Sequence, residues 1–294
     1  MAVLEQGVWY PNKDASELTA EDQFALPSQI EVGRYHLYMS LACPFAHRPY
    51  LVIKYLGLDE VISISSVAAK RYSNGWEFDG AHPDPLYRAD NLAALYVKAK
   101  SDYTGRVTVP LLWDKQNHVI VGNDSAAMAM DLATRWLPWA KLPVELVPAA
   151  LREEIESLNR WLHSNVNGKV YQVGFATSQA HYDQASETLF DALEQLDQRL
   201  GQSRYLHGED VTLSDLFLLP TLVRFEAVYE VHFKANKKPL KAHPNLYRYM
   251  LDLVADERIR STIDIDYMKL HYFFSHKHIN PNGIVPAGPE IEWI

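Results

Sequence analysis

A single change of hydrophobic pattern divides this chain of 294 residues, and it constrains the fold more than any other feature. In the first half, short β-branched and apolar runs alternate with helical patterns. From Pro148 onward the strand pattern disappears, and amphipathic runs follow at about 148–164, 182–200, 212–230 and 243–256. Because single cores rarely exceed roughly 250 residues, we expect two domains, the second of them helical. The predicted linker is the proline-rich segment 137–148.

The first half has the order of strands and helices of a known domain type. Residues 34–40 have the pattern of a strand, and a helix follows that ends at Gly57. Further strands are predicted at 61–67, 107–112 and 118–121, of which the last two form a hairpin before a helix that begins at about 123–125. The order β-α-β, then β-β-α, predicts a thioredoxin-like domain over residues 34–136.

The remaining boundaries follow from the same patterns. Residues 1–33 are predicted to be an N-terminal extension, and residues 69–105 an insertion in the thioredoxin-like domain. An insertion of this length inside a compact domain is often functional. The all-helical domain is predicted at 147–270, with a kink at Pro220, and a C-terminal tail at 271–294.

Composition narrows the classes of partner. The net charge is −9, so the surface is a poor match for nucleic acid or for an anionic membrane. The sequence has no run of about 18 apolar residues and no secretory leader pattern. A single cysteine forms neither an internal disulfide nor a cysteine-rich zinc site. We therefore expect a cytoplasmic protein with no membrane or nucleic-acid partner.

Two clusters of basic and histidine residues have simple explanations. The segment 234–243 is interpreted as a solvated basic loop, although its lysines leave open a contact with an anionic ligand. The tail holds His271, His276 and His278, whose spacing does not fit a metal site. We therefore predict no metal.

The single cysteine, Cys43, lies between the first predicted strand and the helix that follows it. A sulfur just before a helix N-terminus is close to free N–H groups and to the positive end of the helix dipole, which favours the thiolate. Pro44 suits the first helical position, because its missing N–H is not needed there. We therefore predict that Cys43 is a nucleophile, in preference to the alternative of a buried structural cysteine.

A nucleophilic cysteine without a second cysteine must be resolved by an external thiol, for which glutathione is the obvious candidate. The helix start at Asp124 and Ser125 offers N–H groups and a hydroxyl to a carboxylate of glutathione; the alternative is that both residues only cap the helix. His36 and His47 flank Cys43 and leave open a cysteine hydrolase, in which an imidazole deprotonates the thiol.

A family resemblance rests on seven segments in order along the chain: LACPFAHRP, NGWEFD, TGRVTVPLLWDK, NDSA, VYQVGFATSQ, LVRFEAVYEVHFK and HYFFSHKHINPNGIVPAGP. Together they resemble the glutathionyl-hydroquinone reductases, the Xi class of the glutathione transferases, over about residues 33–289. The resemblance implies a glutathione transferase fold, with an α/β thioredoxin-like N-terminal domain plus an all-α C-terminal domain. It also implies a homodimer that takes glutathione and glutathionylated aromatic substrates.

The resemblance assigns roles to individual residues. Cys43 matches the catalytic nucleophile, and Tyr171, Tyr229 and Tyr272 match three tyrosines around the catalytic sulfur and the aromatic pocket. From their chemistry we predict that Tyr171 is catalytic and that Tyr229 and Tyr272 stabilise the thiolate. The matches to the family's glutathione site are Trp76, Arg106, Val107, Thr108, Val109, Pro110, Asp124 and Ser125, with Pro110 at the position of a cis-proline. This chain departs from the family at Phe45, where Trp is usual, and at Asp124, where Glu is usual. The alternatives are that Trp76 is a loop anchor, Arg106 a solvated charge and the tyrosines ordinary aromatics. The length of the insertion favours a glutathione-site role for Trp76, and the place of Arg106 just before a strand favours a carboxylate partner.

The implied reaction is the reduction of an S-glutathionyl-hydroquinone to a hydroquinone through a Cys43–glutathione mixed disulfide, with release of oxidised glutathione. Tyr171 is the predicted acid that protonates the ring carbon. Two alternatives stay open. One is a glutaredoxin-like thiol transferase or dehydroascorbate reductase that uses the same Cys43, and the other is a non-catalytic binding module of the same fold.

Overall fold

The computed structural model describes residues 3–18 and 21–294. The chain divides into two compact units, Met1–Leu142 and Pro143–Ile294, called here the first and the second unit. The division falls inside the proline-rich segment 137–148. The start of this segment stays with the first unit, because the N–H of Leu142 donates to the carbonyl of Leu56 at 3.0 Å.

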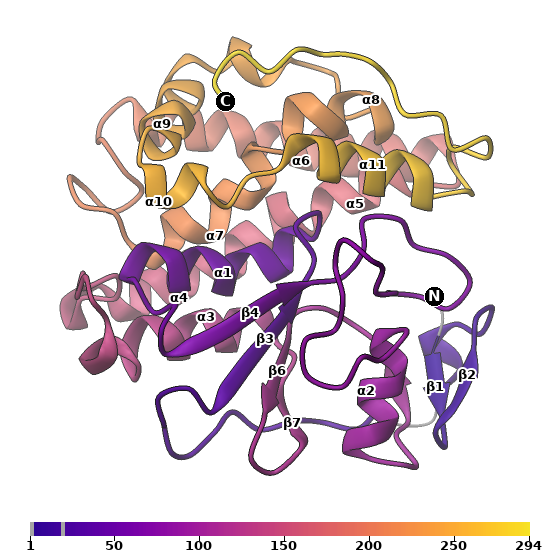
Figure 1. Cartoon of the computed structure of the whole chain (residues 1–294). Helices are drawn as coiled ribbons and strands as arrows, with labels where there is room; N and C mark the ends of the chain where they lie inside the picture. Colours follow the sequence, from indigo (N-terminus) through magenta and orange to yellow (C-terminus); the bar gives the residue numbers. More distant parts are fainter. Residues whose placement is uncertain (1–2, 19–20) are drawn as a thin grey trace. The chain divides into compact units, whose positions relative to one another are not determined.

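The core of the first unit is a four-stranded mixed sheet of β3 (Tyr35–Met39), β4 (Ile62–Ser66), β6 (Leu111–Asp114) and β7 (Val119–Gly122). The strand order is β4-β3-β6-β7 (Figure 1). β3 is parallel to β4 and antiparallel to β6, and β6 pairs with β7 as the predicted hairpin. Every residue of β3 is buried, as expected for a central strand with both faces covered.

Three helices cover this sheet. Helices α1 (Pro44–Leu56) and α3 (Ser125–Thr134) pack against each other on one face, and α2 (Leu92–Ala99) lies on the other (Figure 1). α1 ends at Gly57, whose φ of 66° lies in the left-handed region that glycine adopts without strain. The arrangement confirms the predicted thioredoxin-like fold. The predicted strand at 107–112 is paired only from Leu111, because Pro110 has no N–H to donate to a neighbouring strand.

The N-terminal extension forms a small sheet that the sequence patterns did not predict. Strands β1 (Val3–Glu5) and β2 (Val8–Tyr10) make a hairpin, and β1 also pairs with β5 (Gly105–Arg106) at the end of the insertion. The turn is Gln6-Gly7, with φ of 50° and 73°, which suits a two-residue hairpin. A 3-10 turn follows at Ala15–Glu17. Strands of three residues or fewer are too short for an alternating pattern to identify them.

The insertion is ordered around the buried carboxylate of Asp84. This carboxylate accepts a hydrogen bond from the hydroxyl of Tyr38 on β3 at 2.6 Å, and bonds of 3.0 to 3.1 Å from three backbone N–H groups, those of Leu86, Tyr87 and Ala89. A carboxylate is costly to bury unless such donors surround it. The bonds therefore fix the segment before α2 against the sheet.

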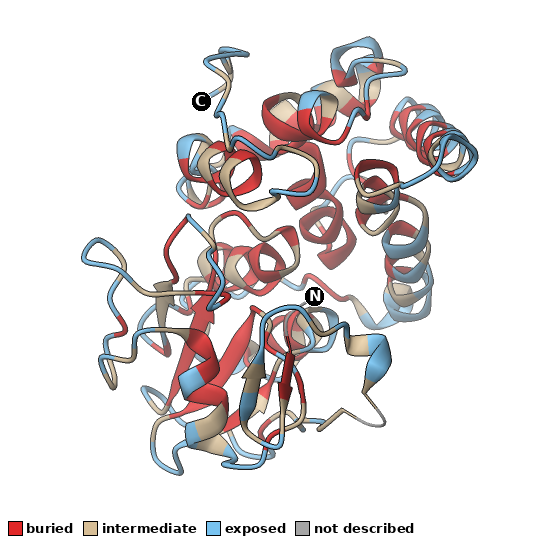
Figure 2. Cartoon of the chain, turned by 90° about the vertical axis from the view of Figure 1, so that its right-hand side faces the viewer, coloured by how far each residue is buried: buried red, intermediate tan, exposed pale blue. Residues whose placement is uncertain are grey.

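The second unit is built of helices, and Figure 2 shows their buried faces. Each of the ten residues of the apolar helix α7 (Leu213–Leu222) is buried, so α7 is the centre of this unit. The other helices are α4 (Arg152–Leu162), α5 (Lys169–Gly174), α6 (Gln179–Leu200), α8 (Glu230–His232), α9 (Pro244–Val254), α10 (Glu257–Arg260) and α11 (Ile265–Ser275). This confirms the predicted all-α second half.

Two helices differ from their predicted bounds. The helix predicted at 212–230 is divided, because α7 ends two residues after Pro220 and a π-helical turn follows at Phe225–Tyr229. A proline removes a backbone hydrogen bond, and a π turn adds a residue, so both interrupt the 3.6-residue period on which the prediction rested. α11 continues through residue 270, where the sequence predicts the beginning of the tail.

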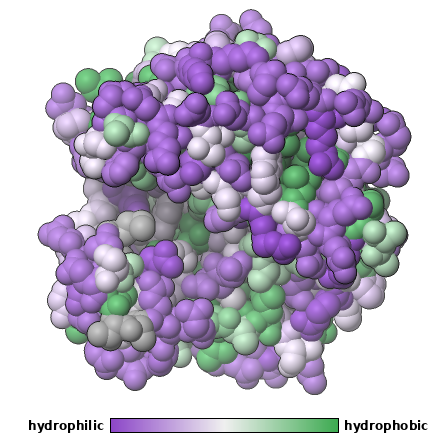
Figure 3. Space-filling model, turned by 180° about the vertical axis from the view of Figure 1, so that it is seen from behind, coloured by the Kyte–Doolittle hydropathy of each residue, from purple (hydrophilic) through white to green (hydrophobic). Residues whose placement is uncertain are grey.

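Hydrophilic residues cover most of the face shown in Figure 3. Large apolar side chains are mostly buried in the two cores. Among the described residues, no helix combines the length and the apolar character needed to cross a bilayer.

Candidate active site

Cys43 is the N-cap residue of α1, as predicted. Its backbone is extended, with φ of −77° and ψ of 115°, and Pro44 is the first helical residue. The sulfur accepts a hydrogen bond from the N–H of Ala46 at 3.4 Å and lies 3.8 Å from the carbonyl oxygen of Val109. The thiol is half-buried and forms no disulfide. A helix N-terminus and a directed N–H group both stabilise negative charge on such a sulfur.

The segment 107–110 passes beside this sulfur and is fixed by two buried tyrosines. The hydroxyl of Tyr96 donates to the carbonyl of Thr108 at 3.0 Å and accepts from its N–H at 3.3 Å. The hydroxyl of Tyr103 donates to the carbonyl of Arg106 at 2.9 Å. Val107 and Val109 are buried, and the Val109–Pro110 peptide bond is cis, as the resemblance implies. The structure therefore places this predicted binding segment next to Cys43.

Arg106 lies at the surface, and its guanidinium has a carboxylate partner from the extension. Its Nε is 3.1 Å from one carboxylate oxygen of Glu21. Arg106 is therefore paired within the chain and is not an isolated solvated charge. No local sequence pattern indicates this partner, because Glu21 is 85 residues away from Arg106.

The predicted pair at the start of α3 caps this helix. The carboxylate of Asp124 accepts hydrogen bonds from the N–H groups of Ala126 and Ala127 at 2.8 and 2.9 Å. These two donors are therefore already used by the protein, as the capping alternative expects. The Asp124 side chain is exposed, and an exposed carboxylate is suited to an ammonium group.

Arg48 joins the two helices that carry Cys43 and Ser125. Its side chain is buried in α1, and Nη1 donates to the hydroxyl of Ser125 at 3.3 Å. Its guanidinium carbon also lies 4.9 Å from the ring centroid of Phe45, the residue at which the family usually has Trp. Arg48 thus orients Ser125 and packs on Phe45.

Trp76 is buried in the loop between β4 and α2. Its carbonyl accepts the N–H of Leu92, the first residue of α2, at 2.7 Å. Its ring lies 5.1 Å from the guanidinium carbon of Arg71, a cation–π contact. Arg71 was not among the predicted site residues. The only sequence signal for it is its place just before the turn that contains Gly75.

The three predicted tyrosines form one hydrogen-bonded group in the second unit. The hydroxyl of Tyr272 lies 2.5 Å from that of Tyr171 and 3.2 Å from that of Tyr229. Tyr229 and Tyr272 are fully buried, whereas Tyr171 is half-buried. Burial raises the pKa of Tyr272 well above its usual value, so this hydroxyl stays protonated at neutral pH. The three hydroxyl groups carry three hydrogens, and the two hydrogen bonds between these hydroxyls use two of them. One hydrogen therefore remains for donation outside the group.

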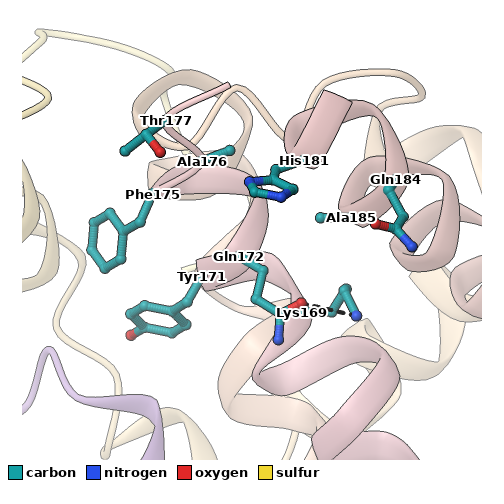
Figure 4. A pocket seen from close by; sticks show the side chains of 9 residues that line it. All are labelled: Lys169, Tyr171, Gln172, Phe175, Ala176, Thr177, His181, Gln184 and Ala185. Carbon is teal, nitrogen blue, oxygen red and sulfur yellow. Dashed lines mark hydrogen bonds between the residues drawn. The ribbon is translucent and has the colours of Figure 1, made fainter. Parts of the chain in front are cut away.

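A cavity of about 640 Å³ lies beside Tyr171 in the second unit. Figure 4 shows the side chains that line it, from α5, from the start of α6 and from the loop that joins them. Tyr171 and Phe175 supply aromatic surface, and Lys169 is tied to Gln172 by a hydrogen bond of 2.9 Å. The other lining residues are Ala176, Thr177, His181, Gln184 and Ala185. The cavity thus combines apolar surface with polar groups, as small-molecule sites do.

His36, one of the two histidines that flank Cys43 in the sequence, is engaged away from the thiol. Both ring nitrogens of His36 are hydrogen-bonded at 2.8 Å to hydroxyls, those of Ser63 and Ser65. Burial lowers the pKa of His36 to about 4, so the ring is neutral at pH 7. His47 is buried in α1, with its ring 6.2 Å from that of Tyr50.

The histidines of the tail pack among aromatic rings. His276 is hydrogen-bonded to His232 at 3.0 Å, and the rings of His276 and His278 lie about 5 Å from that of Phe175. Within residues 3–18 and 21–294, no group of three or more His, Cys, Asp or Glu side chains has the arrangement of a metal site.

The basic segment 234–243 is paired with acidic side chains. Lys238 lies 2.9 Å from Glu194, and Lys241 lies 3.2 Å from Glu226. These lysines are therefore engaged in surface ion pairs, and the solvated-loop interpretation fits them better than an anion site.

Comparison with known proteins places both halves of the chain in one family. Two family models match: the glutathione S-transferase N-terminal domain over residues 42–135, and the glutathione S-transferase C-terminal domain over residues 179–251. The chain is 45% identical to the glutathionyl-hydroquinone reductase YqjG of Escherichia coli over 263 residues, which cover 88% of this chain and 80% of that protein.

Solved structures agree with this assignment. The Xi class glutathione transferase of Natrialba magadii superimposes with a TM-score of 0.95 and 36% identity, covering 100% of this chain and 94% of that one. The glutathione-bound structure of YqjG from Escherichia coli superimposes with a TM-score of 0.91 and 41% identity, covering 99% of this chain and 96% of that one. The chain therefore belongs to the glutathionyl-hydroquinone reductases, the Xi class of the glutathione transferase family.

Proposed function

We propose that the protein reduces S-glutathionyl-hydroquinones to hydroquinones, with glutathione as co-substrate and oxidised glutathione as second product. The observation that carries the proposal is the position of Cys43, a half-buried cysteine outside any disulfide, whose sulfur accepts an N–H at the start of α1. The likeness to YqjG, which is named a glutathionyl-hydroquinone reductase, supports the choice of substrate.

The reaction has two half-reactions. In the first, the Cys43 thiolate attacks the sulfur that joins glutathione to the ring, the ring carbon–sulfur bond breaks, and the ring carbon takes up a proton. This gives the hydroquinone and a Cys43–glutathione mixed disulfide. In the second, the thiolate of another glutathione attacks the disulfide, so that oxidised glutathione leaves and the Cys43 thiolate is restored.

The difficult step is the departure of an aromatic carbon. A proton delivered to that carbon gives a keto tautomer, from which the ring leaves as an enolate and becomes aromatic again. We assign this proton to Tyr171, because this residue is half-buried and lines the cavity of Figure 4. Tyr272 and Tyr229 support Tyr171 through their mutual hydrogen bonds, and the one spare hydrogen of the group is available to the thiolate or to the substrate.

Glutathione itself is held in the first unit. We assign its contacts to Trp76, to the backbone of segment 107–110 and to the start of α3, where Asp124 takes the ammonium group and Ser125 a carboxylate. Arg106 is the second candidate partner for a carboxylate of glutathione. The existence of a glutathione-bound structure of YqjG supports this choice of ligand.

Assembly and location are part of the same proposal. We expect a cytoplasmic homodimer, as the Xi-class resemblance implies. Exposed apolar side chains of the second unit, Val231, Ile284 and Val285, are candidates for the contact between two copies. Sedimentation of the wild type and of Val231→Asp tests this: a dimer that becomes a monomer supports the contact, and a wild-type monomer contradicts it.

The assay that tests the reaction compares two substrates. Purified protein is given glutathione with either glutathionyl-menadione or dehydroascorbate, and the release of hydroquinone or ascorbate is measured. The proposal predicts turnover of the glutathionylated quinone. Activity with dehydroascorbate alone would favour the thiol transferase alternative, and a Cys43→Ala protein as active as wild type would contradict the assignment of the nucleophile.

A further inference from the structure

The cavity beside Tyr171 has two sides of different character, and the mechanism above uses only one of them. Figure 4 shows the rings of Tyr171 and Phe175 together on one side. The side chains of Lys169, His181 and Gln184 lie toward the other side. The volume of about 640 Å³ falls within the roughly 300 to 1,000 Å³ of small-molecule sites, so the cavity has room for a ring and a substituent. The polar side is therefore available to a group that the ring carries.

The aromatic side is held in place by its neighbours in the second unit. The ring centroid of Phe175 lies 5.8 Å from that of Tyr171 and 5.1 Å from that of Phe233, both in edge-to-face geometry. His276 and His278, which follow α11, pack on the same ring with centroids 5.1 and 4.9 Å away. A substrate ring therefore meets a preformed aromatic surface next to Tyr171.

The polar side supplies cationic and N–H donor groups. Lys169 is half-buried, and its ammonium group donates to the side-chain oxygen of Gln172 at 2.9 Å. Because an ammonium group has three hydrogens, two remain for a further acceptor. The imidazole of His181 carries an N–H in either neutral tautomer and in the charged form. Among the described residues around the cavity there is no aspartate or glutamate.

The acidic residue of α6 nearest to His181 in the sequence belongs to another face of this helix. His181, Gln184 and Ala185 are three and four residues apart, so they share one face of α6. Asp183 lies on a different face, where it accepts a hydrogen bond from Gln179 at 2.8 Å. The cavity thus offers its donors to an anion in a chain whose net charge of −9 otherwise repels anions.

We propose that this cavity selects hydroquinone rings that carry an acidic substituent such as a carboxylate, with Lys169 and His181 as the residues that determine this specificity. The ring lies against Tyr171 and Phe175, and its carboxylate accepts charge-assisted hydrogen bonds at the polar side. The inference rests on the proposed function, which makes a hydroquinone ring the ligand, and it names the class of ring that the site prefers.

The test compares the equilibrium binding of 2,5-dihydroxybenzoate and of unsubstituted hydroquinone by isothermal titration calorimetry at low ionic strength. The two ligands differ only in the carboxylate, so the ratio of their dissociation constants isolates its contribution. We expect the wild type to bind the carboxylated ring about tenfold more tightly, and Lys169→Gln and His181→Gln each to reduce this preference to about threefold or less. Lys169→Glu should bind the unsubstituted ring more tightly, because like charges repel.

The matched control is Lys237→Gln, which removes the same charge from an exposed position of the second unit outside the cavity lining. It should keep the tenfold preference. Glutathione also carries carboxylates, so its binding is measured with the same proteins. Wild type and Lys169→Gln should bind glutathione equally, because its proposed contacts lie in the first unit. Weaker binding of glutathione by Lys169→Gln, with an unchanged ring preference, would assign Lys169 to glutathione and overturn the inference.

The outcomes separate this inference from the proposed function. Equal binding of the two rings by the wild type, or a preference that neither Lys169→Gln nor His181→Gln changes, overturns the selection of acidic rings even if glutathionyl-menadione is reduced. If the wild type fails to reduce glutathionyl-menadione but loses its ring preference in these variants, the proposed reaction is wrong and the specificity stands. Variants are compared only where their urea unfolding midpoints match that of the wild type, and the two substitutions lie on different helices so that the test survives the loss of one.

Discussion

Glu21 of the N-terminal extension holds the guanidinium of Arg106, with Nε 3.1 and 3.3 Å from its two carboxylate oxygens. Arg106 is one of the residues proposed to bind a carboxylate of glutathione. Because the pair lies near the surface, an incoming carboxylate competes with Glu21 for the same guanidinium. The extension therefore supplies an internal competitor for one proposed contact of glutathione.

Replacing this competitor by a neutral side chain tests the contact. In Glu21→Gln we expect the KM for glutathione to fall by about two- to fivefold, with kcat unchanged, because Arg106 is released for the ligand. Arg106→Leu is expected to raise the same KM. Glu60→Gln, which removes a surface ion pair with Lys141, is the control and leaves KM unchanged. A higher KM in Glu21→Gln would mean that Glu21 positions Arg106 and does not compete for it.

Removal of the Tyr171 hydroxyl separates the two half-reactions. We expect Tyr171→Phe to lower kcat for a glutathionyl-hydroquinone by roughly 10² to 10⁴, because the ring carbon loses its acid. Release of glutathione from a preformed Cys43 mixed disulfide should stay at the wild-type rate, since a thiolate leaves without protonation of carbon. Stopped-flow measurement of each step checks this.

The control for Tyr171 is another tyrosine of the same unit with a single hydrogen bond to the backbone. Tyr182 is half-buried, and its hydroxyl donates to the carbonyl of Lys234 at 2.7 Å. Tyr182→Phe is expected to keep both rates. An equal loss of both half-reactions in Tyr171→Phe would assign Tyr171 to binding or to the thiolate, and not to the protonation of carbon.

Acid should destabilise the first unit through His36. Its pKa is lowered by burial from 6.5 to about 4, so the folded state binds fewer protons than the unfolded state between these values. The lowered pKa of His36 contributes to the free energy of unfolding. This contribution is fully present above pH 6.5 and is lost as the pH falls through 4. The free energy of unfolding should therefore fall by about 3 kcal/mol from this group between pH 7 and pH 4.

Urea unfolding of wild type and His36→Gln between pH 7 and pH 4 measures the contribution of His36 to the free energy of unfolding. Glutamine can still form hydrogen bonds with Ser63 and Ser65, but it does not titrate. The variant should lose about 3 kcal/mol less than the wild type over that range. His181→Gln, at an exposed position of α6, is the control and should follow the wild type. If the free energy of unfolding had the same pH dependence in wild type and in His36→Gln, the proposed contribution of His36 would be contradicted.

The fold was largely predictable because its signals are local. The strand before Cys43, the proline after it and Gly57 define α1 from sequence alone, and the structure places the helix between them. The extension was not predictable, because β1 and β5 pair over about a hundred residues and have three and two residues. The division of the helix after Pro220 was also missed, because a π turn leaves no periodic signal.

A site residue was predictable from the sequence only where its residue type and its place in a local pattern together indicate its chemical role. Cys43 was identified from its place before a helix, whereas the tyrosines are three of 17 and were singled out by the family resemblance. Glu21 was missed because its ion pair with Arg106 joins residues that are 85 positions apart, and Arg71 because its contact with Trp76 depends on the turn between them. No local pattern distinguishes such a charge from a solvated one.

The central claim is that Cys43 takes the glutathionyl group from the substrate. The most direct measurement is mass spectrometry of the intact protein after one equivalent of glutathionyl-menadione in the absence of free glutathione. The account predicts a mass increase of one glutathionyl group on Cys43, with release of the hydroquinone, and its loss on addition of glutathione. No adduct in wild type while hydroquinone is released, or the same adduct in Cys43→Ser, would contradict it.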